Sequence, residues 1–322
     1  MALLGQGLLA ACAPRFAPPG PTIGEPQLQD HRFITRDGLD LPVRIWLPDE
    51  APKALLVALH GFNDYANSFV EPANFWRRAG IGTYAYDQRG FGKTDNPGYW
   101  PGIDALTGDA ADMVQILRRR YPGVPVYLLG DSMGGAVAAV TAANGSPGSV
   151  DGIILMAPAV WARDTMNPFQ SGLLWVAAHS VPWMTVSGRG LDIQPSDNIG
   201  MLHALSRDPL VLKDARIDTL YGLVDLMDTA MADAAKLRGP VFVLYGDRDE
   251  VVPREPMMEF LRRLTDADAE LRAAFYPKGY HMLVRDKDGE TPMRDIEAWI
   301  FDHGGSLPSG ADARARQALA AR

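Results

Sequence analysis

A serine flanked by glycines lies where a predicted strand meets a predicted helix. Residues 130–134 have the pattern G-x-S-x-G, preceded by an aliphatic run at 126–129 and followed by small residues with helical spacing. A sharp strand-turn-helix of this kind strains the serine backbone and lifts the hydroxyl clear of the sheet edge. We therefore predict that Ser132 is a nucleophile. Gly130 and Gly134 support the turn, because a Cβ at either position would clash where strand and helix pass closely.

A serine hydroxyl is a weak nucleophile at neutral pH, so it needs a base within hydrogen-bond reach and a carboxylate that orients this base. We select His281 as the base because it alone lies in the loop after the last predicted strand, 271–275. The other histidines are His31, His60, His179, His203 and His303. The loop after the predicted strand 240–245 carries three acidic candidates, which are Asp247, Asp249 and Glu250. The residues alone do not choose among these three.

Acyl transfer also needs hydrogen-bond donors directed at the oxygen that becomes negative. We predict that the backbone N–H groups of Phe62 and Met133 form this oxyanion hole. Met133 directly follows the nucleophile, and Phe62 follows the His60-Gly61 turn at the end of the apolar run 54–59. Gly61 allows the backbone to come close to a substrate carbonyl.

The elements that would position these residues alternate between strands and helices. Apolar strands are predicted at 54–59, 82–86, 125–129, 152–156 and 240–245, and helical patterns at 68–79, 103–120, 256–264 and 293–303. A hairpin of 31–35 and 41–47 with an Asp-Gly turn precedes them. This alternation predicts an α/β fold with a mostly parallel central sheet flanked by helices. An open parallel sheet places its active site at the carboxyl ends of its strands, where the candidate residues lie.

The alternation stops between the two parts of the predicted core, 28–156 and 238–304. The intervening segment, 157–237, contains three of the seven tryptophans. We predict that it is a helical cap inserted after the sixth strand. Most of its aromatic side chains would pack the cap onto the core, while a subset would line an acyl-sized pocket or touch lipid. The candidates for this subset are Trp161, Phe169, Leu174, Trp175 and Trp183.

The composition is that of an ordinary globular protein, with 322 residues, 47% apolar content and 22% charged content. The formal net charge of -8 provides no basic surface for nucleic acid, which we therefore exclude as a partner. A single cysteine, Cys12, excludes an internal disulfide and a thiolate metal cluster. The predicted chemistry implies no metal and no organic cofactor.

The N-terminal residues have the character of an export signal. A short apolar run ends in Leu-Ala-Ala before Cys12, and this tetrapeptide resembles the lipobox of bacterial lipoproteins. We interpret residues 1–12 as a lipoprotein signal segment, which places the protein on a bacterial membrane facing the periplasm. The alternative is a cytoplasmic protein with an incidental cysteine. Residues 13–27 would form a flexible tether, and residues 305–322 a loose C-terminal tail.

Taken together, the motifs resemble the monoacylglycerol lipase and lysophospholipase branch of the α/β-hydrolases, which is often grouped with the serine aminopeptidases. The motifs are residues 130–135, the His60-Gly61-Phe62 turn, the loop 87–92, Gly246-Asp247-Arg248-Asp249 and Gly279-Tyr280-His281. The resemblance covers roughly residues 31–303 and implies the α/β-hydrolase fold, in which the order Ser, Asp, His is used. In this branch the fourth residue of the Gly-x-x-Asp loop is the triad acid, which implies Asp249.

The resemblance implies a serine hydrolase that cleaves carboxylic esters of single acyl chains, either monoacylglycerols or lysophospholipids, through an acyl-enzyme intermediate. One alternative is a carboxylesterase of broad range for small esters, and another is a serine aminopeptidase. The Trp, Leu and Met content of the cap favours acyl chains over peptides. From a different class, a ligand-binding protein on the same fold would use its triad little or not at all. The expected partner is a small lipid ester, with membrane attachment through Cys12 and the apolar cap.

Overall fold

A nine-stranded sheet forms the centre of the protein, in the strand order β1-β2-β3-β5-β4-β6-β7-β10-β11. The computed structural model describes residues 13–146, 148–188, 190, 192–267 and 269–321. The strands are β1 (Gln27–Gln29), β2 (Arg32–Ile34), β3 (Asp40–Trp46), β4 (Ala54–Leu59), β5 (Ile81–Tyr86), β6 (Val126–Asp131), β7 (Gly152–Met156), β10 (Gly239–Gly246) and β11 (Ala269–Tyr276). The first three are antiparallel to their neighbours, and the others pair in parallel. The predicted mostly parallel sheet is confirmed.

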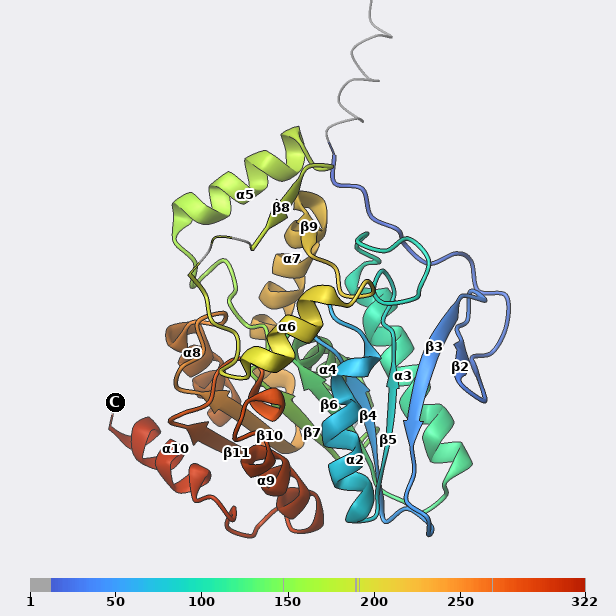
Figure 1. Ribbon diagram of the computed structural model, residues 1–322, viewed down its shortest axis with the longest axis vertical. Helices are drawn as coiled ribbons and strands as arrows, with labels where there is room; N and C mark the ends of the chain where they lie inside the picture. Colours follow the sequence, from blue (N-terminus) through green and yellow to red (C-terminus); the bar gives the residue numbers. More distant parts are fainter. Residues whose placement is uncertain (1–12, 147, 189, 191, 268, 322) are drawn as a thin grey trace, which may run out of the picture.

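Helices cover both faces of this sheet (Figure 1). One face carries α3 (Ile103–Arg120), α4 (Met133–Asn144), α7 (Ile217–Asp233) and α8 (Arg254–Thr265), and the other carries α2 (Val70–Arg78) and α9 (Glu290–Phe301). Along β4, Leu55 and Val57 belong to the first core, whereas Leu56 and Ala58 belong to the second. Because successive side chains of a strand point to opposite faces, a strand covered on both sides must be apolar at every position.

The segment between β7 and β10 differs from the predicted helical cap. It forms α5 (Pro168–Ser180), β8 (Thr185–Ser187), α6 (Ile199–Arg207), β9 (Asp214–Arg216) and α7, and β8 pairs with β9 in a small antiparallel sheet. In addition, α7 packs on α4 with Leu226, Ala230 and Met231 buried, so its C-terminal part belongs to the core. The insertion follows the seventh strand rather than the sixth, because β1 has the sequence Gln-Leu-Gln and carries no hydrophobic strand pattern.

The C-terminal segment is not the loose tail that we predicted. It contains α10 (Ala311–Ala320), which packs against β11 with Ala311 and Ala315 buried. The side chain of Asp312 accepts hydrogen bonds from Arg272 of β11 and from Arg316, each at 2.9 Å. The small side chains of α10 leave no amphipathic pattern in the sequence. They do allow this helix to approach β11, the edge strand, closely.

Residues 13–26 contain no helix or strand, yet they are held against the folded body rather than extending from it as a tether. The N–H of Ala17 donates to the carbonyl of Trp100 at 2.8 Å, and the N–H of Ile23 donates to that of Arg36 at 2.7 Å. The interpretation of residues 1–12, including Cys12, concerns a segment outside the described residues. Among the described helices, none is long and apolar enough to cross a membrane.

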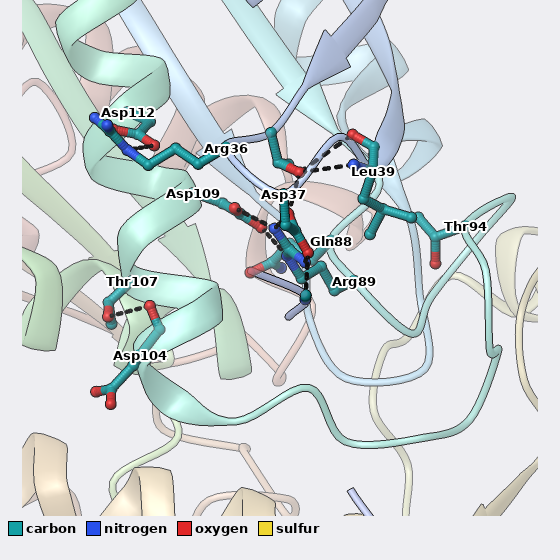
Figure 2. A network of polar contacts seen from close by, with 12 residues as sticks. Arg36, Asp37, Leu39, Gln88, Arg89, Thr94, Asp104, Thr107, Asp109 and Asp112 are labelled. Carbon is teal, nitrogen blue, oxygen red and sulfur yellow. Dashed lines mark hydrogen bonds and ion pairs between the residues drawn. The ribbon is translucent and has the colours of Figure 1, made fainter. Parts of the chain in front are cut away.

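A buried ion-pair network ties the N-terminal hairpin to the sheet (Figure 2). Arg89, in the loop after β5, donates to Asp37 in the hairpin turn at 2.8 and 2.6 Å, and to Asp109 on α3 at 2.6 and 3.0 Å. All three side chains are less than a tenth exposed. Arg36 joins the same turn to Asp112, one helical turn further along α3. Three segments distant in sequence are therefore linked through one guanidinium.

We predict that Arg89→Met lowers the free energy of unfolding by about 3 to 5 kcal/mol, because it leaves two buried carboxylates without their cation. Urea denaturation followed by circular dichroism measures this change. The matched control is Arg32→Met, which removes the solvent-exposed pair of Arg32 and Asp40 and is expected to change the free energy of unfolding much less. Equal losses for the two variants would contradict the prediction.

Candidate active site

Ser132 lies at the turn between β6 and α4, with φ of 52° and ψ of -114°. This backbone conformation is unfavourable for a residue that has a Cβ, and the neighbouring strand maintains it. The N–H of Ser132 donates to the carbonyl of Met156 at 2.9 Å, and the N–H of Ala159 donates to the carbonyl of Ser132 at 2.9 Å. The nucleophile is thus held between β6 and the end of β7.

The two glycines that flank this turn have no room for a side chain. A Cβ on Gly130 would lie 2.1 Å from the carbonyl oxygen of Gly134. A Cβ on Gly134 would lie 2.0 Å from the carbonyl oxygen of Leu59, at the end of β4. The helix after the nucleophile therefore passes in direct backbone contact with two central strands.

The structure brings His281 and Asp249 together from the loops after β11 and β10. Their Nδ1 and Oδ2 atoms are 2.8 Å apart, and both side chains are buried. The second oxygen of Asp249 accepts the N–H groups of Val251 and Val252 at 2.8 and 2.9 Å. With Nδ1 donating to the carboxylate, Nε2 remains the basic nitrogen of His281. Burial lowers the pKa of His281, but the charge and hydrogen bond of Asp249 outweigh this effect and raise it above its ordinary value.

The other two acidic candidates are engaged elsewhere. Asp247 pairs with Arg254 at the start of α8. A side-chain oxygen of Glu250 accepts the N–H of Gln194 in the cap at 2.7 Å. Geometry therefore assigns Asp249 as the partner of the histidine, the choice that the family resemblance implied and that the residues alone left open.

The predicted oxyanion donors face the same cavity as the nucleophile. Phe62, Met133, Ser132 and His281 all line a cavity of about 250 Å³. Among the described residues, the N–H groups of Phe62 and Met133 have no recorded hydrogen-bond acceptor. A Cβ on Gly61 would lie 3.4 Å from the Cβ of Ser132, so the turn that carries Phe62 runs beside the nucleophile.

His60 holds this turn and takes no part in the histidine–carboxylate pair. Its Nε2 accepts the N–H of Gln88 at 2.9 Å, so its Nδ1 carries the proton and donates to the carbonyl of Gly61 at 2.8 Å. The side-chain amide of Gln88 donates in turn to the carbonyl of His60 at 2.9 Å. Burial lowers the pKa of His60, which keeps the ring neutral in this arrangement. Gln88 therefore supports the turn from the loop 87–92, which was part of the family resemblance, although the sequence analysis assigned this residue no individual role.

The cavity walls are largely apolar but come from elements that the sequence did not single out. Of the five cap candidates, Trp161 alone lines the cavity. The remaining apolar lining residues include Ala159, Pro195, Leu223, Met227, Val251, Val252 and Met282. Leu223 and Met227 are one helical turn apart on α7. This helix, rather than α5, therefore presents the apolar surface above the nucleophile.

The other four cap candidates do not line this cavity. Phe169, Trp175 and Trp183 are 76%, 54% and 54% exposed, and Leu174 is half-buried on α5. Figure 1 shows α5 at the top of the molecule, beyond α7. The sequence could not make this distinction because α5 is apolar over most of its circumference, so its pattern does not identify a single buried face.

Three charged side chains also border the cavity, namely Asp64, Asp131 and Arg285. Arg285 and Asp64 are in contact at 2.8 Å. The sequence analysis missed all three, although the position of Asp131 directly before the nucleophile was a signal that could have identified it. Within the described residues, no cluster of three or more His, Cys, Asp or Glu side chains is arranged to hold a metal ion.

The chain is similar in sequence to known proteins. The family described as serine aminopeptidase, S33, matches residues 50–288 of the chain. The monoacylglycerol lipase of Mycolicibacterium smegmatis is 26% identical over 286 residues, which cover 85% of this chain and 97% of that protein. The human monoglyceride lipase is 27% identical over 279 residues, which cover 83% and 89%.

Solved structures share the fold. The monoacylglycerol lipase of Paleococcus ferrophilus superposes with a TM-score of 0.67 at 24% identity, over 82% of this chain and 99% of that one. A soluble variant of the Saccharomyces cerevisiae monoglyceride lipase, solved in complex with a substrate analogue, gives a TM-score of 0.69 at 19% identity, over 90% and 98%.

We predict that Gly134→Ala lowers both activity and stability, because its methyl group cannot be placed without moving the carbonyl of Leu59 or the nucleophile. The expected loss is about 1 to 3 kcal/mol of unfolding free energy, with at least a tenfold fall in the rate of acyl transfer. Thermal denaturation and initial rates measure the two effects. Gly108→Ala is the matched control, since Gly108 lies on the exposed side of α3 with open space around it and should gain about 1 kcal/mol. An active and stable Gly134→Ala variant would refute the steric argument.

Proposed function

The chain belongs to the serine aminopeptidase (S33) family, and from this premise we propose that it is a serine hydrolase of carboxylic esters with a single acyl chain. The substrates that we propose are monoacylglycerols or lysophospholipids. The observation that carries the proposal is the placement of Ser132 and the His281–Asp249 pair on one cavity with largely apolar walls. The monoacylglycerol and monoglyceride lipases among the relatives support the same class of substrate.

The geometry supports a two-step reaction. Nε2 of His281 removes the proton of Ser132 while the serine oxygen attacks the ester carbonyl, and the N–H groups of Phe62 and Met133 stabilise the resulting oxyanion. The imidazolium then gives its proton to the departing alcohol, which leaves the acyl group on the serine. Water attacks this acyl-enzyme with His281 again as base, and the fatty acid and the free serine are released. Asp249 holds the imidazole in the required tautomer throughout.

The charges at the cavity do not favour an aminopeptidase. Recognition of a free amino terminus requires a carboxylate that is available to the ammonium group. Of the two aspartates that line the cavity, Asp64 is already paired with Arg285 at 2.8 Å, and burial raises the pKa of Asp131 to about 6, which disfavours its charged form. An acyl chain, in contrast, fits the aliphatic walls supplied by α7.

The decisive experiment compares initial rates on p-nitrophenyl esters of increasing chain length, monoacylglycerol, lysophosphatidylcholine and an aminoacyl-nitroanilide. We expect the highest kcat/KM for medium or long acyl chains. Ser132→Ala should reduce hydrolysis by at least about a thousandfold, and Asp249→Asn by about ten-thousandfold, with the fold retained by circular dichroism. Ser206→Ala, at an exposed position on α6, is the control that should change nothing.

Each alternative outcome has a clear meaning. Activity confined to acetyl esters would identify a carboxylesterase for small esters, and activity confined to the nitroanilide would identify a peptidase. Tight retention of a lipid ester with no turnover would identify a binding protein on this fold.

We also propose that the protein is a bacterial lipoprotein, attached to the membrane through Cys12 and facing the periplasm. An exposed apolar surface on and after α5 supports attachment; it comprises Phe169, Leu173, Trp175, Val176, Trp183, Met184 and Val186. The backbone N–H of Arg15 donates to Asp218 in the first turn of α7, which follows β9, the partner strand of β8. Three residues span at most about 10 Å, so an anchor at Cys12 and this apolar surface would meet the same bilayer.

We predict that Cys12→Ser transfers the full-length protein from the membrane fraction to the soluble fraction of a bacterial host. Mass spectrometry of the wild type should show an acylated Cys12. In the Cys12→Ser background, Phe169→Ser with Leu173→Ser should weaken flotation with phospholipid vesicles by about tenfold or more, because two large apolar side chains are lost from the contact. An unmodified Cys12 in a soluble wild-type protein would favour the cytoplasmic alternative.

A further inference from the structure

A buried ion pair joins two loops of the active site that are far apart in sequence. Nη2 of Arg285 lies 2.8 Å from Oδ2 of Asp64, and both side chains are about nine-tenths buried. Asp64 lies two residues after Phe62, and its N–H donates to the carbonyl of Gly61 at 3.2 Å. Arg285 lies four residues after His281, at the end of the short 3₁₀ helix η3 (Leu283–Arg285).

The pair therefore connects the two loops that must cooperate in acyl transfer. The first loop carries a predicted oxyanion donor, and the second carries the catalytic base. A second interaction fixes each partner locally: Oδ1 of Asp64 accepts the N–H of Tyr65 at 2.9 Å, and the N–H of Arg285 donates to the carbonyl of Met282 at 2.8 Å. A guanidinium clamped in this way sets the distance between the loops, and a misplacement of about 1 Å can cost a hundredfold in rate.

Arg285 also has an electrostatic role, because it is the one arginine or lysine among the described residues that line the cavity. The titratable groups around it come from several elements. They are His60 and Asp64 after β4, Asp131 at the end of β6, Asp249 after β10 and His281 after β11, with Glu71 of α2 and Asp208 after α6 on an adjoining cavity. Carboxylates thus outnumber cations around the catalytic base, and the arginine partly compensates for them.

We propose that Arg285 is a positioning residue of the active site, which joins the oxyanion loop to the histidine loop through Asp64 and balances the carboxylate of Asp131 beside the nucleophile. The inference rests on the proposed ester hydrolysis. It assigns a role to two charged side chains that take no part in the proton transfers of that reaction.

The electrostatic part of this role has a defined sign. Asp131 raises the pKa of His281 and Arg285 lowers it, although burial and Asp249 have larger effects. Burial raises the pKa of Asp131 itself to about 6, with Arg285 acting in the opposite direction. His281 must be neutral to act as the base, so kcat/KM falls as the pH drops below its pKa. This fall is the acid limb of the pH profile. Loss of the arginine charge should move the acid limb to higher pH, and loss of the Asp131 charge should move it to lower pH.

The test measures fatty acid release from a monoacylglycerol between about pH 5 and pH 9 for the wild type and for Arg285→Gln, Arg285→Lys and Asp131→Asn. For Arg285→Gln we expect kcat to fall about 10- to 100-fold with little change in KM. The acid limb should move to higher pH by about half a pH unit or more. Arg285→Lys should keep the wild-type limb because it keeps the charge. Asp131→Asn should move the limb in the opposite direction.

Arg285→Gln leaves Asp64 buried without its cation and can fail to fold for this reason. The double variant Asp64→Asn with Arg285→Gln then takes its place, since two neutral amides leave no unpaired charge buried between the loops. The largest effects on the pKa of His281 come from burial, Asp249, Asp131 and Arg285, so the same upward movement of the limb is expected when the arginine charge is lost.

A folded Arg285→Gln or double variant with a wild-type kcat and an unmoved limb would overturn the proposal. If both Arg285 variants lose thermal stability but keep the wild-type pH profile, the pair is only a structural contact. This result would also overturn the proposal. If the wild type hydrolyses no ester, the proposed function fails first and this role fails with it.

Discussion

The close passage of α4 across the ends of β6 and β4 is the constraint on which the rest of the site depends. At Gly134 and Gly130 the backbones are so close that a methyl group would lie about 2 Å from a carbonyl oxygen. This approach forces Ser132 into a backbone conformation with positive φ, which costs on the order of 1 to 3 kcal/mol. Hydrogen bonds to the backbone around the end of β7 and the fully buried strand β6 offset this strain.

The sequence predicts the part of the structure that follows from local rules. Apolar runs such as 54–59 can satisfy two buried faces at once, which is why the central strands and the position of Ser132 at a strand end were recognisable. The choice of acid was not recognisable from the residues alone. Asp247, Asp249 and Glu250 lie within four positions, and what separates them is the turn that directs Asp249 toward His281 and the other two toward Arg254 and the cap.

The elements that were missed share a different physical cause. The three residues of β1 and the alanine-rich α10 are stabilised by pairing and packing against edge strands, contacts that leave no periodic apolar pattern in the chain. For α5 the hydrophobic pattern does not identify a buried face, because exposed and buried positions are both apolar. Three residues of α5 were among the pocket candidates for this reason, whereas Leu223 and Met227 of α7 line the cavity.

The cap is also linked to catalysis through the histidine loop, which connects substrate entry to the chemistry. The N–H of Met282 donates to the carbonyl of Pro195 at 2.9 Å, and Ser196 donates to Asp286 at 2.6 Å. Asp286 in turn accepts the N–H of Tyr280, the residue before the catalytic base. A displacement of this cap segment would therefore shift the loop that holds His281. Because the same loop ends at Arg285, the cap, the base and the oxyanion loop form one connected set of polar contacts.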